Sequence, residues 1–255
     1  MLDVLLTRWQ QGHRTMRYPD GPPPELPPRF AGRPVLDASK CTEGCGQCGI
    51  VCPTAAIAMG PAGRGVQVDT GRCLFCRSCE TACPTGAITL SRNHRMAATR
   101  REDLIVRDDA PAVVRPDETI HRLFGRSLKL RQVSAGGCGA CEADTNVLGT
   151  VAWDLGRFGV QFVASPRHAD GLLITGAVSE NMRAALKKTY DAVPGPKLVI
   201  AVGACAIAGG PYIDHPEVHN GVGSVLPVDL FIPGCPPHPL TILDALLTFL
   251  GRVAA

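Results

Sequence analysis

The twelve cysteines of this 255-residue chain are the residues best suited to chemistry. Eight of them lie between residues 41 and 83, and the other four are spread over the second half. Cysteine thiolates form disulfides, bind metals or act as nucleophiles, and in a reducing compartment metal binding is the expected use of clustered thiols. Residues 1–12 lack the apolar core of a secretory signal, and no run of about 18 apolar residues occurs. We therefore expect a cytoplasmic protein whose thiols bind metal.

A repeated cysteine motif fills residues 41–83. Its second half is Cys73-x-x-Cys76-x-x-Cys79-x-x-x-Cys83, followed by Pro84. This spacing is typical of bacterial [4Fe-4S] proteins, because three thiolates on one tight loop reach three corners of a cubane cluster. The first half carries Cys41, Cys45, Cys48 and Cys52, and segment 52–59 resembles segment 83–90. Two similar half-units predict an α+β module with two clusters and a pseudo-twofold axis.

The fourth ligand of each cluster is expected to come from the other half of the repeat. In two-cluster ferredoxins, the cysteine that precedes proline binds the other cluster. One cluster should therefore be held by Cys73, Cys76, Cys79 and Cys52, and the other by Cys41, Cys45, Cys48 and Cys83. The spacing from Cys41 to Cys45 is one residue longer than usual. Zinc usually takes two Cys-x-x-Cys pairs separated by roughly a dozen or more residues, and a zinc-binding structural bridge remains the alternative.

The last four cysteines each follow a predicted strand. Cys138 and Cys141 follow the strand 127–133, Cys205 follows 198–202, and Cys235 follows 228–232. Because the carboxyl ends of parallel strands meet at one edge of a sheet, these thiols can converge on one metal site. Glycines and prolines fill the same loops and let the backbone approach a bulky group. Two other interpretations stay open, a thioredoxin-like pair at the first two positions and buried structural thiols at the last two.

Alternating strands and helices are predicted throughout the second half of the chain. The predicted strands span residues 127–133, 160–163, 172–175, 198–202 and 228–232. The predicted helices span residues 142–155, 179–191 and 240–250. The last of them is expected to be amphipathic, because Asp244 interrupts its apolar run. This alternation predicts an α/β domain with a parallel sheet covered on both faces.

The chain divides into four parts by composition. Residues 1–35 are rich in Pro and Arg and are expected to form an extended arm without helix. Residues 36–96 form the predicted two-cluster domain. Residues 97–124 are charged and irregular, which is typical of a linker. Residues 125–255 form the α/β domain.

Charge and glycine patterns argue against nucleic acid and nucleotide as partners. The net charge is only +3, and no stretch of basic residues interleaved with aromatics occurs. No phosphate-binding glycine loop opens a predicted helix, so neither nucleotide nor flavin is expected.

Four blocks of the second half resemble one known family. Residues 136–142, 165–170, 203–210 and 228–237 are similar, in the same order, to the small subunit shared by respiratory complex I (its 20 kDa subunit) and membrane-bound [NiFe] hydrogenases. Residues 10–105, with Tyr18-Pro19 and the segment 30–34, resemble the two-cluster ferredoxin subunit of formate hydrogenlyase and its complex I relative. The chain thus looks like a fusion of two neighbouring subunits, and the resemblance implies a flavodoxin-like second domain.

The resemblance implies three [4Fe-4S] clusters that relay electrons, with no bond chemistry by this chain alone. An electron-donor subunit would dock at the first domain, and a large catalytic subunit would cover the second. Glu142 directly after Cys141, together with His168, is similar to the hydrogenase and formate hydrogenlyase branch. The alternative is a fusion resembling the B and I subunits of NADH-quinone oxidoreductase, which would deliver electrons to quinone beside a 49 kDa-like subunit. Membrane subunits would hold the complex at the inner face of the cell membrane.

Three further residues are candidates for proton transfer or partner contact. Glu142 opens a predicted helix, where a carboxylate is favoured by the helix N-terminus without any other role. Arg167 and His168 follow a strand, where such residues are usually surface groups. The resemblance implies that all three lie near the cluster or the subunit junction.

Overall fold

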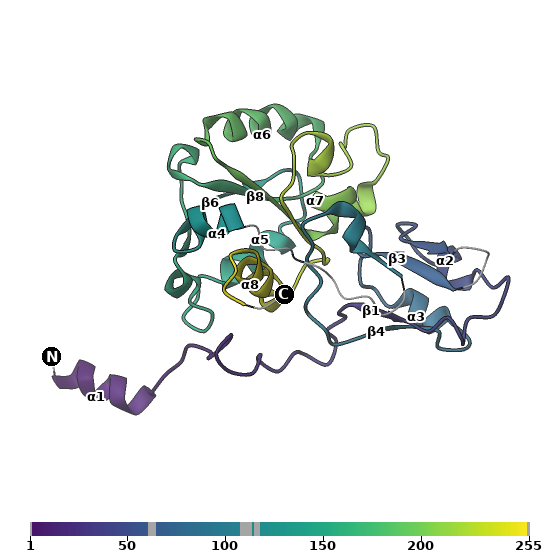
Figure 1. Ribbon diagram of the computed structural model, residues 1–255, viewed down its shortest axis with the longest axis horizontal. Helices are drawn as coiled ribbons and strands as arrows, with labels where there is room; N and C mark the ends of the chain where they lie inside the picture. The colour runs from purple at the N-terminus through teal and green to yellow at the C-terminus, as the bar shows by residue number, and fades with distance from the viewer. Residues whose placement is uncertain (1, 61–64, 108–113, 115–117, 254–255) are drawn as a thin grey trace.

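The computed structural model describes residues 2–60, 65–107, 114 and 118–253 (Figure 1). The second half is built on a sheet of five parallel strands. They are β6 (Leu128–Ser134), β7 (Val160–Phe162), β8 (Gly171–Thr175), β9 (Leu198–Val202) and β10 (Leu230–Ile232). The five strands predicted from the sequence are confirmed. Their order β7-β6-β8-β9-β10 is the 2-1-3-4-5 order of flavodoxin-like sheets.

Helices cover both faces of this sheet, as predicted. In β9, Leu198 and Ile200 face one core while Val199 and Ala201 face the other. The first core contains α8 (Pro239–Phe249) and the start of α5 (Ala140–Val147). The second core is closed by α6 (Glu180–Ala192) and α7 (Gly203–Ala208), and Figure 1 shows α6 on the side of the sheet away from α8.

One predicted helix is shorter than expected. The helix predicted over 142–155 ends at Val147 and is followed by turns and the 3-10 helix η3 (Leu155–Phe158). Gly149 follows Leu148, the buried residue at the end of this helix, and Asp154 adopts a left-handed conformation with φ of 45°. Both features interrupt the helix, because glycine is a poor helix former and a positive φ cannot continue it.

The amphipathic character predicted for the last helix is wrong. All eleven residues of α8 are buried, including Asp244, which is only 5 % exposed. The polar side of this helix does not face water, because Tyr18 from the amino-terminal segment lies against it. The sequence pattern could not show this, because Tyr18 lies more than two hundred positions away from the helix.

The first half forms a smaller unit with two antiparallel sheets. One sheet pairs β1 (Pro34–Leu36) with β4 (Ile88–Leu90), and the other orders β2 (Ile57–Met59), β3 (Val66–Asp69) and β5 (Ile105–Val106). The short helices α2 (Gln47–Ile50) and α3 (Ser78–Ala82) pack against each other. The sequence repeat corresponds to a structural repeat, since each short helix is followed by a Cys-Pro turn and a short strand.

The prediction that residues 1–35 are extended and contain no helix is wrong for the first third of this segment. Leu2–Gln11 form helix α1, because the first proline occurs only at position 19 and Leu2, Leu5, Leu6 and Trp9 recur at helical spacing. No residue of α1 is buried, and the helix stands away from the body in Figure 1. Residues 12–33, called the arm below, contain no helix or strand, as predicted, and run along the second half.

The expected linker also contains regular structure. Residues 101–104 form the 3-10 helix η2 (Arg101–Leu104), β5 joins β3, and α4 (Glu118–Phe124) buries Phe124 in the core of the second half. Leu104 and Val106 are buried, but they stand singly among charged residues. The sequence of this segment therefore shows no apolar periodicity from which a helix or strand could be predicted. Residues 108–113 and 115–117 of this segment lie outside the described residues. Among the described helices, none has the length and apolar character needed to cross a membrane.

Candidate iron-sulfur sites

One cavity of the first half is lined by four thiols from both halves of the repeat. They are Cys52, Cys73, Cys76 and Cys79. The loop that carries the last three turns sharply, because Phe75 and Arg77 adopt left-handed conformations with φ of 54° and 66°. Most of the remaining wall is apolar and includes Val68 and Ile88. These are the four residues that the sequence predicted as one ligand set.

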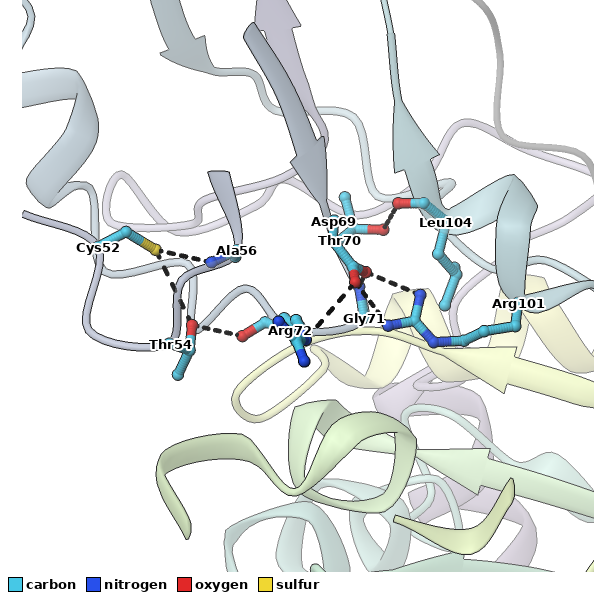
Figure 2. Close-up of polar contacts among 9 residues, drawn as sticks. All are labelled: Cys52, Thr54, Ala56, Asp69, Thr70, Gly71, Arg72, Arg101 and Leu104. Atoms are coloured by element: carbon cyan, nitrogen blue, oxygen red, sulfur yellow. Dashed lines mark hydrogen bonds and ion pairs between the residues drawn. The ribbon is translucent and has the colours of Figure 1, made fainter. Parts of the chain in front are cut away.

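Backbone groups and a neighbouring loop hold the Cys52 side of this cavity (Figure 2). The amide of Ala56 donates to Cys52 Sγ at 3.2 Å, and the amide of Phe75 donates to Cys73 Sγ at 3.3 Å. Thr54 Oγ1 donates to the carbonyl oxygen of Arg72 at 2.8 Å, which ties the Cys52 turn to the residue before Cys73. N–H groups directed at sulfur favour the thiolate form and tune the potential of a cluster bound there.

An arginine from the expected linker supports the same loop. Arg101 donates two hydrogen bonds to the carboxylate of Asp69, at 2.8 and 2.6 Å, and that carboxylate also accepts from the amide of Gly71 (Figure 2). Thr70 Oγ1 donates to the carbonyl oxygen of Leu104 at 2.8 Å. This support could not be predicted from the sequence, because it depends on β5 pairing with β3 across an irregular-looking segment.

A second cavity is lined by the other predicted set, namely Cys41, Cys45, Cys48 and Cys83. The amide of Ala87 donates to Cys83 Sγ at 3.2 Å, which repeats the contact between Ala56 and Cys52. Burial alone would raise the pKa of Cys83, but hydrogen bonds from Thr85 and Ala87 outweigh it and lower that pKa. The extra residue between the first two thiols is taken up in a turn at Gly44, whose φ is 74°.

The four cysteines of the second half meet at the carboxyl edge of the parallel sheet, which we call the thiol edge. Cys138 precedes α5, Cys141 lies in α5, Cys205 lies in α7, and Cys235 follows β10. Burial raises the pKa of Cys205 to about 11, and the nearby Cys235 and Cys138 thiols add to the effect. Burial also raises the pKa of Cys141, and the nearby Cys205 thiol and Glu142 carboxylate add to the effect, as do Cys235 and Cys138. Cys138 and Cys235 are exposed.

Glycine is required where the backbone passes these thiols. Gly203 has a φ of 90°, and a Cβ built on it would lie 2.5 Å from Cys141 Sγ. Gly210, in the 3-10 helix η5 (Gly210–Tyr212), has a φ of 57°, and its Cβ would lie 2.6 Å from Cys205 Sγ. The backbone thus leaves room at the sulfurs for a bulky bound group.

The thiol chemistry fits clusters whose iron carries positive charge. Burial raises the pKa of Cys73 to about 12 and that of Cys79 to about 11, so these thiols would stay protonated without a cation. A bound metal deprotonates its thiol ligands outright. In the described part of the chain, no group of three or more His, Cys, Asp or Glu side chains is placed to hold a single metal ion.

The remaining candidate residues differ in their surroundings. Glu142 accepts hydrogen bonds from Ser134 Oγ and Thr175 Oγ1, both at 2.6 Å. Burial would raise the pKa of Glu142, but these two hydroxyls outweigh it and lower that pKa. Arg167 and His168 are exposed in the 3-10 helix η4 (Pro166–His168). Glu142 therefore lies beside the thiol edge as a well-bonded carboxylate, whereas the other two are surface residues.

The two halves of the chain meet next to Cys235. A cavity there is lined by Leu74 and Phe75 from the first half and by Cys235 and His238 from the second. Although Cys235 is exposed, partial burial of its thiol raises its pKa, and the neighbouring Cys138 and Cys76 thiols raise it further. Ala98, just after the two-cluster domain, pairs with Phe231 of β10, the strand that precedes Cys235. The two residues exchange backbone hydrogen bonds of 3.0 and 2.9 Å. Cys76 and Cys235 are thus neighbouring members of two different thiol sets.

Comparison with known proteins gives matches for both halves. Residues 138–249 match the family described as the 20 kDa subunit of NADH ubiquinone oxidoreductase, and residues 36–87 match a 4Fe-4S dicluster domain. The chain is 39 % identical over 133 residues to a probable membrane-bound hydrogenase subunit of Pyrococcus furiosus, a match that covers 52 % of this chain and 80 % of that protein. It is 42 % identical over 118 residues to the B-type subunit of the NADH-quinone oxidoreductase of Clostridium beijerinckii, covering 46 % and 70 %.

Among solved structures, one chain of a membrane-bound sulfane sulfur reductase, an archaeal respiratory membrane complex, is 32 % identical with a TM-score of 0.46. That match covers 52 % of this chain and 73 % of the other. The matches to the curated relatives confirm the resemblance inferred from the sequence blocks. This chain belongs to the family of the 20 kDa subunit of NADH ubiquinone oxidoreductase, and it carries a 4Fe-4S domain ahead of that family's domain.

Proposed function

We propose that this chain is an electron-transfer subunit that holds three [4Fe-4S] clusters. The ligands of two clusters are the crossed sets of the first half, and Cys138, Cys141, Cys205 and Cys235 hold the third. The observation that carries the proposal is the division of eight thiols between two cavities, each lined by three cysteines of one repeat and one of the other. Zinc or disulfide chemistry does not call for this crossed arrangement, whereas two-cluster ferredoxins do.

The residues of the chain position the clusters and tune them. Bound [4Fe-4S] clusters supply one-electron transfer. The amides of Ala56 and Ala87 donate to sulfur in the first two sets, and Gly203 makes room at the third. Apolar side chains that include Ile57 and Val68 in the first cavity and Val66 in the second limit the access of water, which raises the influence of these hydrogen bonds.

The proposal assigns the parts of the chain as follows. Residues 36–96 form the two-cluster domain and residues 125–255 form a flavodoxin-like domain with the third cluster. Residues 1–35 precede the two-cluster domain, and residues 97–124 are the linker between the two domains. Because Cys76 and Cys235 are neighbours, electrons would pass between the domains at this point, from the cluster of the Cys52 set to the thiol edge.

The partners follow from the relatives and from the exposed thiol edge. The two curated relatives are named as subunits of a membrane-bound hydrogenase and of an NADH-quinone oxidoreductase. We infer that a large catalytic subunit covers the thiol edge, that a donor subunit docks at the two-cluster domain, and that membrane subunits hold the complex at the inner face of the membrane. The favoured large subunit is of the [NiFe] type, with Glu142 at the junction. A 49 kDa-like subunit that reduces quinone is the alternative.

Metal analysis of the purified chain tests the proposal. Anaerobically purified protein should contain about twelve iron and about twelve sulfide per chain, as three clusters require. Iron by plasma emission and acid-labile sulfide by colorimetry give these values. Zinc in place of iron, without sulfide, would show that the chain is a zinc-binding structural bridge.

The substitution Gly203→Ala should remove the third cluster alone. The new methyl group would lie only 2.5 Å from Cys141 Sγ, and the positive φ of this residue adds about 1–2 kcal/mol of strain. The iron content should fall by about four per chain, with the signals of the other two clusters unchanged in electron paramagnetic resonance (EPR) spectra. The matched control is Gly223→Ala, in the 3-10 helix η6 (Val222–Ser224), where a Cβ meets no atom within 4 Å. A full complement of iron in the Gly203 variant would contradict the assigned site.

A further inference from the structure

A single carboxylate is buried inside an otherwise uncharged helix. Helix α8 contains Pro, Leu, Thr, Ile, Ala and Phe residues and one acid, Asp244, whose side chain is 7 % exposed. Burying an unpaired carboxylate is strongly unfavourable. Other segments can therefore pack over this helix only if they bring polar or charged partners for Asp244.

The partners of Asp244 come from two distant segments. The Tyr18 hydroxyl, from the arm, donates a hydrogen bond to Asp244 Oδ1. Arg95 Nε lies 3.3 Å and His94 Nε2 lies 3.8 Å from the same oxygen. Burial would raise the pKa of Asp244, but the neighbouring His94, Tyr18 and Arg95 outweigh it and keep that pKa below its usual value. The carboxylate is therefore kept charged by groups that reach it only when both segments are docked.

These segments lead directly to the thiol sets. His94 and Arg95 follow β4 and precede Ala98, which pairs with the strand that ends before Cys235. The arm passes on from Tyr18 to Gly32, whose amide donates to the carbonyl oxygen of Ser91 at 2.7 Å. Asp244 thus lies where the arm, the two-cluster domain and the second domain meet.

The N-terminus of the same helix is also in contact with the arm. His238 Nδ1 accepts from the amide of Leu240 at 3.1 Å and caps α8. Its ring contacts Phe30 of the arm edge to face, with the ring centroids 5.6 Å apart. His238 also lines the cavity beside Cys235. A displacement of the arm would therefore reach the loop that carries this thiol.

We propose that Asp244 is a positioning residue that locks the arm and the two-cluster domain onto α8. It thereby fixes the separation between the Cys52, Cys73, Cys76 and Cys79 set and the thiol edge. The rate of electron transfer falls steeply with the separation of the clusters, so this lock sets how fast electrons cross between the domains. The inference rests on the proposed function for its role in electron transfer, but the lock itself does not depend on bound clusters.

Amide hydrogen exchange on the full chain tests the lock. In Asp244→Asn, which is nearly isosteric, the attraction to Arg95 is lost. Amides of the arm such as Met16, which donates to the carbonyl oxygen of Ala152 at 2.9 Å, should then exchange at least about tenfold faster, because breaking a buried ion pair is strongly destabilising. The matched control is Thr241→Val on the same helix. Its hydroxyl is buried and has no hydrogen-bond partner among the described residues.

A second variant and a second readout complete the test. Tyr18→Phe removes only the hydroxyl donor and should also loosen the arm. Its effect and that of Asp244→Asn should be less than additive, because Tyr18 and Arg95 both contact the same carboxylate oxygen. In cluster-loaded protein, the magnetic coupling seen by EPR between the reduced clusters should weaken in either variant and stay unchanged in Thr241→Val.

Each outcome decides a separate point. Arm exchange in both variants no faster than in the Thr241→Val control would show that Asp244 locks nothing. Faster arm exchange with unchanged magnetic coupling would show that the lock does not set the cluster separation. If the wild-type chain binds no clusters, the proposed function fails, but the exchange comparison still decides whether Asp244 holds the arm.

Discussion

Replacing Cys52 with alanine should abolish the cluster held by Cys73, Cys76 and Cys79, although Cys52 belongs to the other half of the sequence repeat. Its thiol lines the cavity of those three residues, and its Sγ accepts a hydrogen bond from Ala56 there. A cubane cluster that has lost one of four protein ligands is expected to degrade. The iron content of the Cys52→Ala protein should therefore fall from about twelve to about eight per chain. EPR and Mössbauer spectra identify which cluster is missing.

The mirror substitution provides the control. Cys83→Ala should remove the cluster of Cys41, Cys45 and Cys48 and leave the Cys52 set intact, because Cys83 lines the other cavity. The two variants should lose different spectral signals. If Cys52→Ala instead loses the signal that Cys83→Ala is expected to lose, each repeat binds its own cluster and the crossed assignment is wrong.

The parts of the fold that could be predicted are determined by residues close together in the sequence. The strands β8 and β9 appear as short apolar runs, because strands covered on both faces need apolar residues on both sides. The cysteine spacing predicts tight loops that direct three thiols at one point. Once the strands were assigned, the rule for parallel sheets placed the last four thiols on one edge, and the structure brings them together there.

The parts that were missed depend on contacts between distant segments. Asp244 predicts a solvent-facing side for α8, and its burial follows only from Tyr18 and Arg95 being docked on it. Arg101 stands in a segment without apolar period, so its support of Asp69 could not be seen. The helix α1 was missed because its composition was averaged with the proline-rich residues that follow.

The largest effect on assembly is expected from a charge at the thiol edge. Ala140 lies between Cys138 and Cys141 at the start of α5, beside a surface where Cys138 and Cys235 are exposed. If a large subunit covers this edge, as proposed, Ala140→Glu would bury an unpaired carboxylate in the interface. Such a group costs several kcal/mol, and each 1.4 kcal/mol weakens binding about tenfold. Affinity purification of the tagged chain from cells that make the whole complex should then recover at least about tenfold less large subunit.

The matched control places the same charge at the other end of the same helix. Asn146 is exposed in the last turn of α5, about 9 Å along the helix axis from Ala140, so Asn146→Glu should co-purify with the large subunit as the wild type does. Iron analysis of both isolated variants should still give about twelve iron per chain, which separates lost docking from lost clusters. Undiminished co-purification of the Ala140→Glu chain, with full electron transfer, would place the partner on another surface. In that case the exposed Cys138 and Cys235 would face solvent in the complex, and the third cluster should be degraded by oxygen as readily there as in the isolated chain.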